Sequence, residues 1–263
     1  MSISFTGRVA NPNYLNMLAP CIASKNTDVF YQICATVLND FRKSIETESE
    51  LNAHPLALYA GNEGNYFSPN DDCICLDFNQ ALRESTDLNS VDLLLGSLGH
   101  ELGHFYVMRL SNYYKKNIHI LWNELMADFT GGFLFGLDQD NDVRTRDLNL
   151  DGRKRYFPYR RKSVYPAIPG TNEGYREQLD GKHPFCALRI AAIEMGFNKG
   201  VYLKDFALPL GLTENLATVY DTFMEQMCNY FNSNVNIQYI VKDLLNYNPS
   251  SAVIPPSPTF FLK

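Results

Sequence analysis

Three observations predict an α+β fold for this chain of 263 residues. Apolar residues recur with a helical period over 27–41, and 118–135 is an apolar stretch without proline that is long enough for a second, buried helix. Between these helices lie short extended segments, at 56–59, 66–67 and 73–76, bounded by turn-forming residues. A mainly helical C-terminal part follows, with helices expected at 183–196, 213–232 and 234–247. The length predicts one domain covering residues 1–263.

The first helix is expected to begin at Thr27, whose hydroxyl can cap the free backbone N–H groups of a first turn. Its apolar stripe follows a 3.6-residue period and should face the core. The polar residues after it, Glu46 to Glu50, are expected to lie at the solvated surface. The apolar stripe consists of Phe30, Ile33, Cys34, Val37, Leu38 and Phe41.

The extended segments predict a small antiparallel sheet. Gly61 to Gly64 and Ser68 to Asp71 separate them, and both stretches have strong turn compositions. Short connections of this kind favour neighbouring strands that run in opposite directions. The sheet should precede a helix that begins at Asn89 or Ser90.

Three glycines, Gly96, Gly99 and Gly103, occur within that next helix. Each glycine lowers helix propensity, so their clustering indicates that another backbone packs closely against this helix.

The same helix carries His100-Glu101-Leu102-Gly103-His104, an H-E-x-x-H sequence. Residues four apart lie on one face of a helix, so His100 and His104 can bind one metal ion together. Glu101 lies beside that face, where it can accept a proton from water instead of binding the metal. A chance match remains the alternative, with both histidines as ordinary helix residues.

Glu124 and Asp128 are also four residues apart, in the helix expected over 118–135. A catalytic zinc site has three protein ligands and one open position, and Glu124 can be the third ligand. Asp128 can accept a hydrogen bond from a ligating histidine and so fix its tautomer. The alternatives are a solvated carboxylate and an ordinary salt-bridge partner.

These motifs resemble those of the gluzincin metallopeptidases. The 19 residues between His104 and Glu124 are similar to the spacing in the thermolysin-like branch. The Glu124-Leu-Met-Ala-Asp128 segment is similar to the CAAX-prenyl-peptidase branch, as is His183-Pro184 followed by Arg189. The resemblance covers roughly 73–197. No apolar stretch is long enough for a membrane span, which argues against prenyl-peptidase activity itself.

The resemblance implies a zincin-like fold and a zinc-dependent metallopeptidase that acts on a peptide or protein substrate. It implies that His183 stabilises the oxyanion and that Arg189 braces the acidic residues behind the metal. Tyr175 is a further candidate oxyanion donor, from its position alone.

In zincins an exposed edge strand next to the metal helix holds the substrate as an added strand. We expect this strand to comprise Cys73, Ile74, Cys75 and Leu76. We expect one of its two thiols in the core and the other at the surface, rather than a metal site.

The segment 137–182 is polar and lacks apolar periodicity, so it is expected to be an insertion or a lid. Asp147 to Gly152 begins like a calcium-binding EF-hand loop, with oxygen ligands at alternate positions. The closing position is occupied by Pro158 instead of a carboxylate. The two interpretations are therefore a Ca²⁺ site that lacks its closing ligand and an ordinary Asn/Asp/Gly turn.

Residues 153–162 alternate basic and aromatic side chains. Such a stretch can bind single-stranded nucleic acid, form a solvated loop, or select acidic peptides. The net charge of −6 argues against a protein that binds polyanions with its whole surface.

Three functions remain open from the sequence. The first is a zinc metalloendopeptidase with Glu101 as general base, which an intact glutamate favours. The second is a non-catalytic, metal-binding scaffold of the same fold. The third is a protease recruited to nucleic acid by residues 153–162.

The six cysteines are scattered, and the N-terminus lacks a basic and then apolar signal pattern. Reduced thiols and a cytoplasmic location are therefore expected. Residues 249–263 form a proline-rich tail that should be extended.

Overall fold

The computed structural model describes residues 14–84, 90–115, 118, 120–138, 186–210, 212 and 214–233. This part of the chain is mostly helical and contains a three-stranded mixed sheet, as an α+β fold requires. The N-terminal elements are α1 (Tyr14–Ala23), α2 (Thr27–Ile45), α3 (Glu48–Ala53), β1 (Ala57–Gly61), β2 (Tyr66–Ser68), β3 (Cys73–Asp77) and α4 (Phe78–Glu84). The remaining elements are α5 (Ser90–Tyr114), α6 (Ile120–Asp138), α9 (Cys186–Tyr202), the π-helix η1 (Leu203–Ala207), the 3₁₀-helix η2 (Leu208–Leu210) and α10 (Leu216–Ser233).

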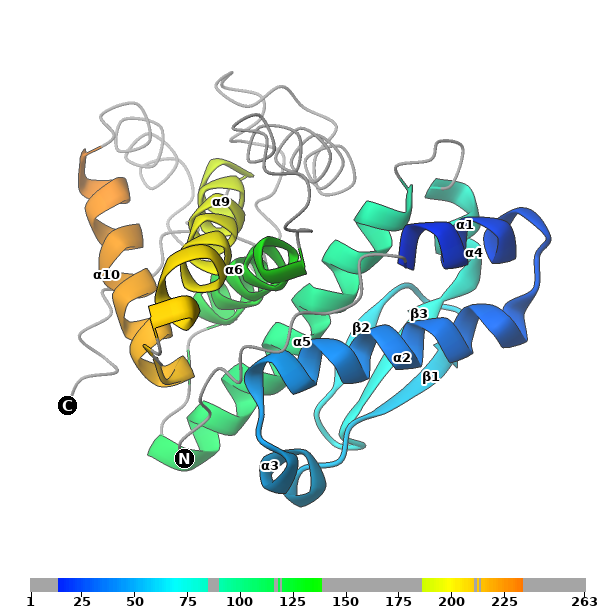
Figure 1. The fold of residues 1–263 in the computed structure, drawn as a ribbon, viewed down its shortest axis with the longest axis horizontal. Helices are drawn as coiled ribbons and strands as arrows, with labels where there is room; N and C mark the ends of the chain where they lie inside the picture. Colours follow the sequence, from blue (N-terminus) through cyan, green and yellow to red (C-terminus); the bar gives the residue numbers. More distant parts are fainter. Residues whose placement is uncertain are drawn as a thin grey trace, which may run out of the picture.

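Helix α5 separates the two halves of the described fold. In Figure 1 the sheet and helices α1 to α4 lie on one side of α5, and α6, α9 and α10 lie on the other. Strand β2 and helices α1, α2 and α4 contact α5 from the first side, and α6 contacts it along the second. The helix with the H-E-x-x-H sequence is therefore covered by both halves.

Helix α2 confirms the predicted apolar stripe, because all six of its residues are buried. The predicted cap is one residue late. Asn26 is the N-cap, and its side-chain oxygen accepts a hydrogen bond from the backbone N–H of Val29 at 3.3 Å. Asn is as good a capping residue as Thr, so composition alone does not separate these two adjacent positions.

The prediction of an antiparallel sheet is wrong. The strand order is β1-β3-β2, with β1 parallel to β3 and β2 antiparallel to β3. The third strand along the chain, β3, therefore lies between β1 and β2 in the sheet. The strand whose five residues are all buried takes the central place, where both of its edges are paired.

The prediction that Cys73, Ile74, Cys75 and Leu76 form an exposed edge strand is also wrong, because they lie in central strand β3. All five residues of β3 are buried, so both thiols are in the interior instead of one. Residues two apart in a strand point to the same face, which is why Cys73 and Cys75 share one environment. The edge strand in contact with α5 is β2, which pairs only with β3 within the described sheet.

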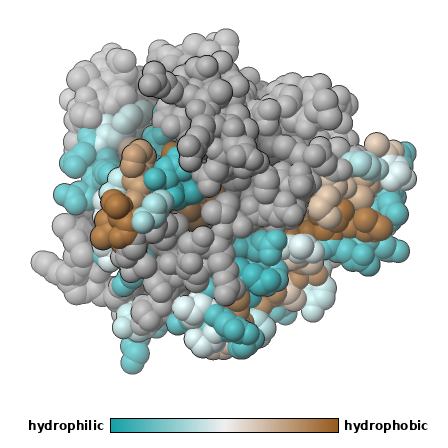
Figure 2. Space-filling view, in the orientation of Figure 1, coloured by the Kyte–Doolittle hydropathy of each residue, from teal (hydrophilic) through white to brown (hydrophobic). Residues whose placement is uncertain are grey.

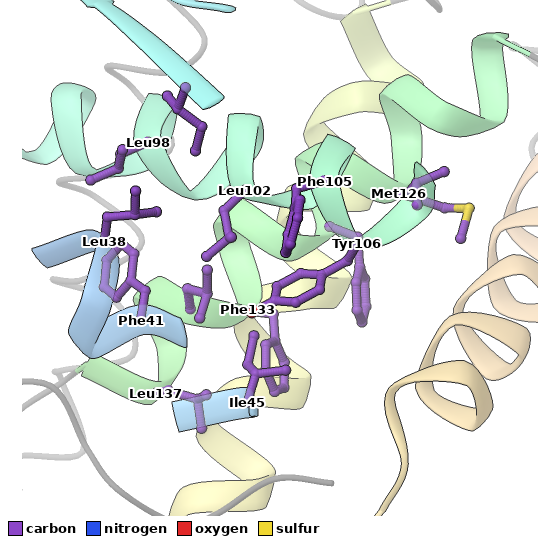
Figure 3. Packing of buried hydrophobic residues seen from close by; sticks show 14 of the residues in the cluster. Leu38, Phe41, Ile45, Leu98, Leu102, Phe105, Tyr106, Met126, Phe133 and Leu137 are labelled. Atoms are coloured by element: carbon purple, nitrogen blue, oxygen red, sulfur yellow. The ribbon is translucent and has the colours of Figure 1, made fainter. Parts of the chain in front are cut away.

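Apolar side chains from α2, α5 and α6 meet in one core. Figure 3 shows Leu38 and Phe41 of α2 near Leu98 and Leu102 of α5, with side chains from α6 completing the cluster. Leu137 is 4% exposed and belongs to this core. The expected insertion at 137–182 therefore begins too early, because α6 continues to Asp138.

Helix α9 packs on α6 at backbone contact. A Cβ atom on Gly132 of α6 would lie 2.1 Å from the carbonyl oxygen of Ile193 in α9. A Cβ atom on Gly196 of α9 would lie 2.0 Å from the carbonyl oxygen of Phe129. Because Gly196 lies inside this contact, it does not end the helix as predicted, and α9 continues to Tyr202.

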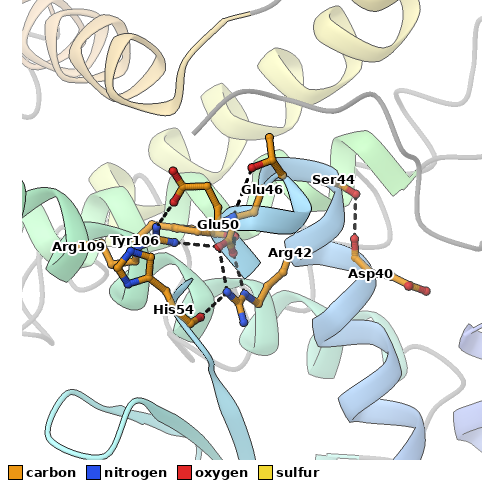
Figure 4. Close-up of polar contacts among 9 residues, drawn as sticks. Asp40, Arg42, Ser44, Glu46, Glu50, His54, Tyr106 and Arg109 are labelled. Atoms are coloured by element: carbon orange, nitrogen blue, oxygen red, sulfur yellow. Dashed lines mark hydrogen bonds and ion pairs between the residues drawn. The ribbon is translucent and has the colours of Figure 1, made fainter. Parts of the chain in front are cut away.

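A buried charged cluster joins the first half of the fold to α5, and it corrects the expectation for Glu46. Glu46 is 1% exposed and accepts hydrogen bonds from Arg42 at 2.7 Å, Tyr106 at 2.8 Å and Arg109 at 2.9 Å. Glu50 binds the other terminal nitrogen of Arg109 at 2.6 Å (Figure 4). Glu46 is buried because two arginines, one of them 63 residues away, neutralise it.

The described surface is mixed in polarity. Figure 2 shows separate hydrophobic areas among hydrophilic ones. The exposed large apolar side chains include Phe206 of η1 and Leu210 of η2, directly after α9. Along the described parts of the chain, every helix is too short or too polar to cross a lipid bilayer.

Candidate metal centre

Helices α5 and α6 each bring two ionisable residues to one place. His100 and His104 come from α5, and Glu124 and Asp128 come from α6. Within the described residues, His100, His104 and Glu124 form a group whose ligand atoms lie within 4.8 Å of one another. These three residues could hold a metal ion.

The two helices come this close because small residues face each other beside the site. A Cβ atom on Gly103 would lie only 2.6 Å from the Cα atom of Ala127. Gly103 directly precedes His104, and Ala127 directly precedes Asp128. The backbones therefore touch at the site itself, as the glycine cluster in the sequence indicated.

The distances between the three candidate ligands fit one small cation. The Nε2 atoms of His100 and His104 are 3.1 Å apart. Each Nε2 atom lies 3.6 Å from an oxygen of Glu124, Oε2 for His100 and Oε1 for His104. Two donors bound tetrahedrally to zinc at their usual bond lengths lie roughly 3.3 Å apart. The observed separations are therefore compatible with three ligands around one small cation.

A buried ion pair lies behind His100. Asp128 Oδ1 is 2.9 Å from Nδ1 of His100 and also accepts a hydrogen bond from Nη2 of Arg189 at 2.9 Å. The Nε atom of Arg189 donates to the other oxygen, Oδ2. Burial opposes ionisation of Asp128, but the charges of Arg189 and His100 outweigh it and hold the pKa of Asp128 well below its ordinary value.

Arg189 also comes close to the third candidate ligand. Its Nη2 atom is 3.8 Å from Oε2 of Glu124, and its side chain, which comes from α9, is 6% exposed. The close packing of α9 on α6 thus brings one guanidinium group to both carboxylates of the site.

Asn123 is a site residue that the sequence analysis missed. Its side-chain oxygen lies 2.8 Å from Nδ1 of His104, the equivalent of the contact that Asp128 makes with His100. A ligating histidine ordinarily donates its second ring nitrogen to such a partner. The missed signal is the amide side chain immediately before Glu124, on the helix that faces His104.

These two contacts indicate where the histidine protons are. Asp128 and Asn123 offer oxygen acceptors to the Nδ1 atoms, and these contacts suit rings that carry a proton on Nδ1. A neutral ring with its proton on Nδ1 leaves Nε2 free to bind a metal ion on the side of Glu124. A proton on one of the two Nε2 atoms would instead be shared between them, because they are 3.1 Å apart.

The site is closed on one side and open on the other. Asp128 is 1% exposed, whereas the side chains of His104 and Glu124 are 16% and 13% exposed. A pocket of about 440 Å³ begins there, and His104, Asn123 and Glu124 form part of its wall. A ligand can therefore approach from the side of the pocket.

Glu101 is buried in α5, directly after His100, and is 7% exposed. His183 and Tyr175 lie outside the described residues, so their expected roles in binding an oxyanion remain predictions. The same holds for the possible Ca²⁺ loop from Asp147 to Gly152 and for the basic segment 153–162.

The arrangement of two imidazoles and a carboxylate can bind a divalent cation and leave a coordination position open toward a pocket. Comparisons with protein-family models, with curated proteins and with solved structures find no match for this chain.

Proposed function

We propose that this chain is a zinc-dependent metallopeptidase with a zincin-like fold. The observation that carries the proposal is the convergence of two Nε2 lone pairs and one carboxylate at 3.1–3.6 Å, with their partners already in place behind them. Two imidazoles and one carboxylate are a ligand set of zinc hydrolases, and imidazole suits zinc better than magnesium or calcium. His100, His104 and Glu124 would hold the ion.

A zinc ion at this position would supply Lewis acidity, which polarises a carbonyl group and makes water acidic near neutral pH. The carboxylate of Glu101 accepts a proton from the attacking water and returns it to the leaving amine. Asp128 and Asn123 keep the protons on the Nδ1 atoms of His100 and His104, so that both Nε2 atoms stay available. Arg189 keeps Asp128 ionised in its buried position.

Strand β2 supports a peptide as the substrate. It is an edge strand of the sheet, it contacts α5, and Phe67 at its centre lines the pocket beside His104. An extended peptide can pair with such an edge through its backbone hydrogen bonds. This role replaces the one that was expected of Cys73 to Leu76.

The proposal is tested by cleavage-site profiling on a mixed peptide library, with zinc-loaded wild type and the Glu101→Gln variant. We expect the wild type to cleave peptides, a chelator to stop cleavage, and added zinc to restore it. We expect Glu101→Gln to lose activity by at least a hundredfold, because a general base contributes about 10²–10⁴ to the rate.

Zinc content serves as the control, because Glu101→Gln should retain stoichiometric zinc. A wild type that binds zinc but cleaves no peptide would identify a non-catalytic metal-binding scaffold. A wild type that binds no zinc would contradict the proposal.

A further inference from the structure

Two free cysteines lie side by side on one face of central strand β3. Ile74 and Leu76 of this strand belong to the hydrophobic core that α2 and α5 share. Alternate residues of a strand point to opposite faces, so Cys73 and Cys75 both lie on the other face of the sheet. Both are buried there, and neither belongs to the core clusters of the described residues.

The residues beside the two thiols come from the neighbouring strands. Ser68 of β2 pairs with Cys73, and Tyr66 of β2 pairs with Cys75. Directly paired residues lie on the same face of a sheet. A hydrogen bond with Cys75 is the largest cause that raises the pKa of Tyr66, so the hydroxyl of this tyrosine reaches the sulfur. Tyr66 is 44% exposed, so solvent and small ions approach the thiols along its side chain.

The two thiols also interact with each other. Burial, the charge of a neighbouring Cys75 thiolate and a hydrogen bond with Cys75 raise the pKa of Cys73 to about 11. Cys73 is therefore a protonated thiol at neutral pH, and a protonated thiol is a poor nucleophile. This argues against a reactive cysteine. It favours a partner that binds sulfur strongly enough to displace the proton.

The geometry of the strand disfavours a disulfide between these cysteines. Residues two apart in a strand have Cα atoms roughly 6.6 Å apart and Cα–Cβ bonds that point the same way. A disulfide requires Cβ atoms about 3.5–4.5 Å apart. The strand would have to bend to close this gap, and both of its edges are paired, one with β1 and the other with β2. A metal ion between the sulfurs spans a wider gap, because each metal–sulfur bond is about 2.3 Å long.

The number of donors selects the kind of metal. Among the described residues, the one group of three or more metal-binding side chains is that of His100, His104 and Glu124, so the two thiols have no third ligand of this kind. Zinc is held by three or four protein ligands, which this site does not offer. Soft thiolate ligands select Cu(I), and this ion is stable with two sulfur ligands alone.

We propose that Cys73 and Cys75 bind one soft monovalent cation of the Cu(I) class as a two-thiolate site. Each thiol releases its proton to solvent, and each sulfur donates one electron pair to the ion, so the step consumes no oxidant or reductant. The site shares no residue with the candidate zinc centre, and it does not depend on the proposed peptidase activity. It reverses the expectation that these thiols are divided between core and surface and hold no metal.

The test is an anaerobic titration of the reduced full chain with Cu(I), in competition with a chromophoric Cu(I) chelator. Zinc is present throughout, so that it competes for the histidines. We expect one Cu(I) per chain, and we expect X-ray absorption at the copper edge to show two sulfur neighbours. Cys73→Ser and Cys75→Ser should each weaken Cu(I) binding at least a hundredfold, because each leaves a single thiolate.

The other buried thiols serve as controls. Burial, followed by the nearby Cys21, raises the pKa of Cys34, so these two form the next candidate pair. Both belong to the hydrophobic core, and the Cys21 thiol donates to the carbonyl oxygen of Met17 at 3.2 Å. Cys34→Ala, and Cys228→Ser at a half-buried position of α10, should leave Cu(I) affinity unchanged.

Three results would overturn the proposal. The first is equal Cu(I) affinity in wild type and both serine variants. The second is a copper spectrum in which nitrogen or oxygen takes the place of the two sulfurs, and this measurement uses the wild type, so it remains decisive if a serine variant does not fold. The third is a Cys73–Cys75 disulfide, detected by peptide mass after treatment with oxidised glutathione, because the thiols would then form a redox pair.

Discussion

Each candidate histidine ligand has its own oxygen partner behind it. Asp128 serves His100 from α6, and Asn123 serves His104 from the same helix. The two partners differ in strength, because Asp128 is an ionised carboxylate held by Arg189 and Asn123 is a neutral amide. Both leave Nε2 as the atom that faces Glu124.

Replacing Asn123 by Ala should weaken zinc binding by roughly 10- to 100-fold, because removal of such a partner releases the orientation and tautomer of the ligand. The dissociation constant can be measured by competition with a chromophoric chelator. Asn112→Ala, an exposed change on α5, is the matched control and should leave zinc affinity unchanged. Equal zinc affinity in both variants would show that Asn123 does not orient His104.

The sequence was sufficient to pair His100 with His104 and Glu124 with Asp128, because spacing by four residues is local information. That the two pairs lie together was expected from the resemblance to gluzincins, since the contact between α5 and α6 is non-local. It did not indicate Asn123. An amide beside a ligand has no periodicity of its own, and its contact with His104 depends on how α6 is rotated against α5.

Close backbone contacts between helices hold the residues of the site in place. Gly103 lies against Ala127 where α5 meets α6, and Gly132 lies against Ile193 where α6 meets α9. The first contact brings the two ligand pairs together, and the second brings Arg189 to Asp128. Small residues at these points determine the spacing between the three helices.

Gly132→Ala tests this packing, because the close contact predicts that the free energy of unfolding decreases instead of increasing. In a free helix this change stabilises by about 1 kcal/mol. Here the added Cβ would lie 2.1 Å from the carbonyl oxygen of Ile193, so α9 must move, and we expect a loss of about 1–3 kcal/mol. Urea unfolding measures the free energy of unfolding. Asn229→Ala, at an exposed position of α10, should be neutral or slightly stabilising, and a stabilised Gly132→Ala would refute the close contact.

The elements that were predicted well are the long periodic helices. The 3.6-residue stripe of α2 is evident from its own residues, and so is the apolar run of α6. The order of the strands was predicted wrongly, because pairing between Ala57 and Cys73 is non-local. Turn compositions show where the chain bends, without showing which strand becomes central.

At the scale of the whole molecule, α5 joins the two halves of the fold through contacts of different kinds. Apolar side chains and glycines face α6, whereas Tyr106 and Arg109 face the charged cluster of α2 and α3. Glu46 could not be identified as buried from its sequence neighbourhood, which is polar. Its neutralising partner, Arg109, is distant in the sequence and meets it only in the folded chain.

Glu46→Gln should destabilise the fold by about 3–5 kcal/mol, because it leaves Arg42 and Arg109 buried without the carboxylate between them. The free energy of unfolding from urea titration measures this loss. Glu48→Gln, at an exposed position of α3, should change it by less than about 0.5 kcal/mol. If the two variants were equally stable, the cluster would not link α2 to α5 energetically.

The central claim is that His100, His104 and Glu124 surround one cation. Anomalous diffraction at the zinc absorption edge, on crystals of the zinc-loaded protein, tests it most directly. We predict one strong peak at about 2.0–2.2 Å from Nε2 of His100, Nε2 of His104 and an oxygen of Glu124. A zinc peak that lies elsewhere, or an empty site with the two imidazoles turned apart, would contradict the account.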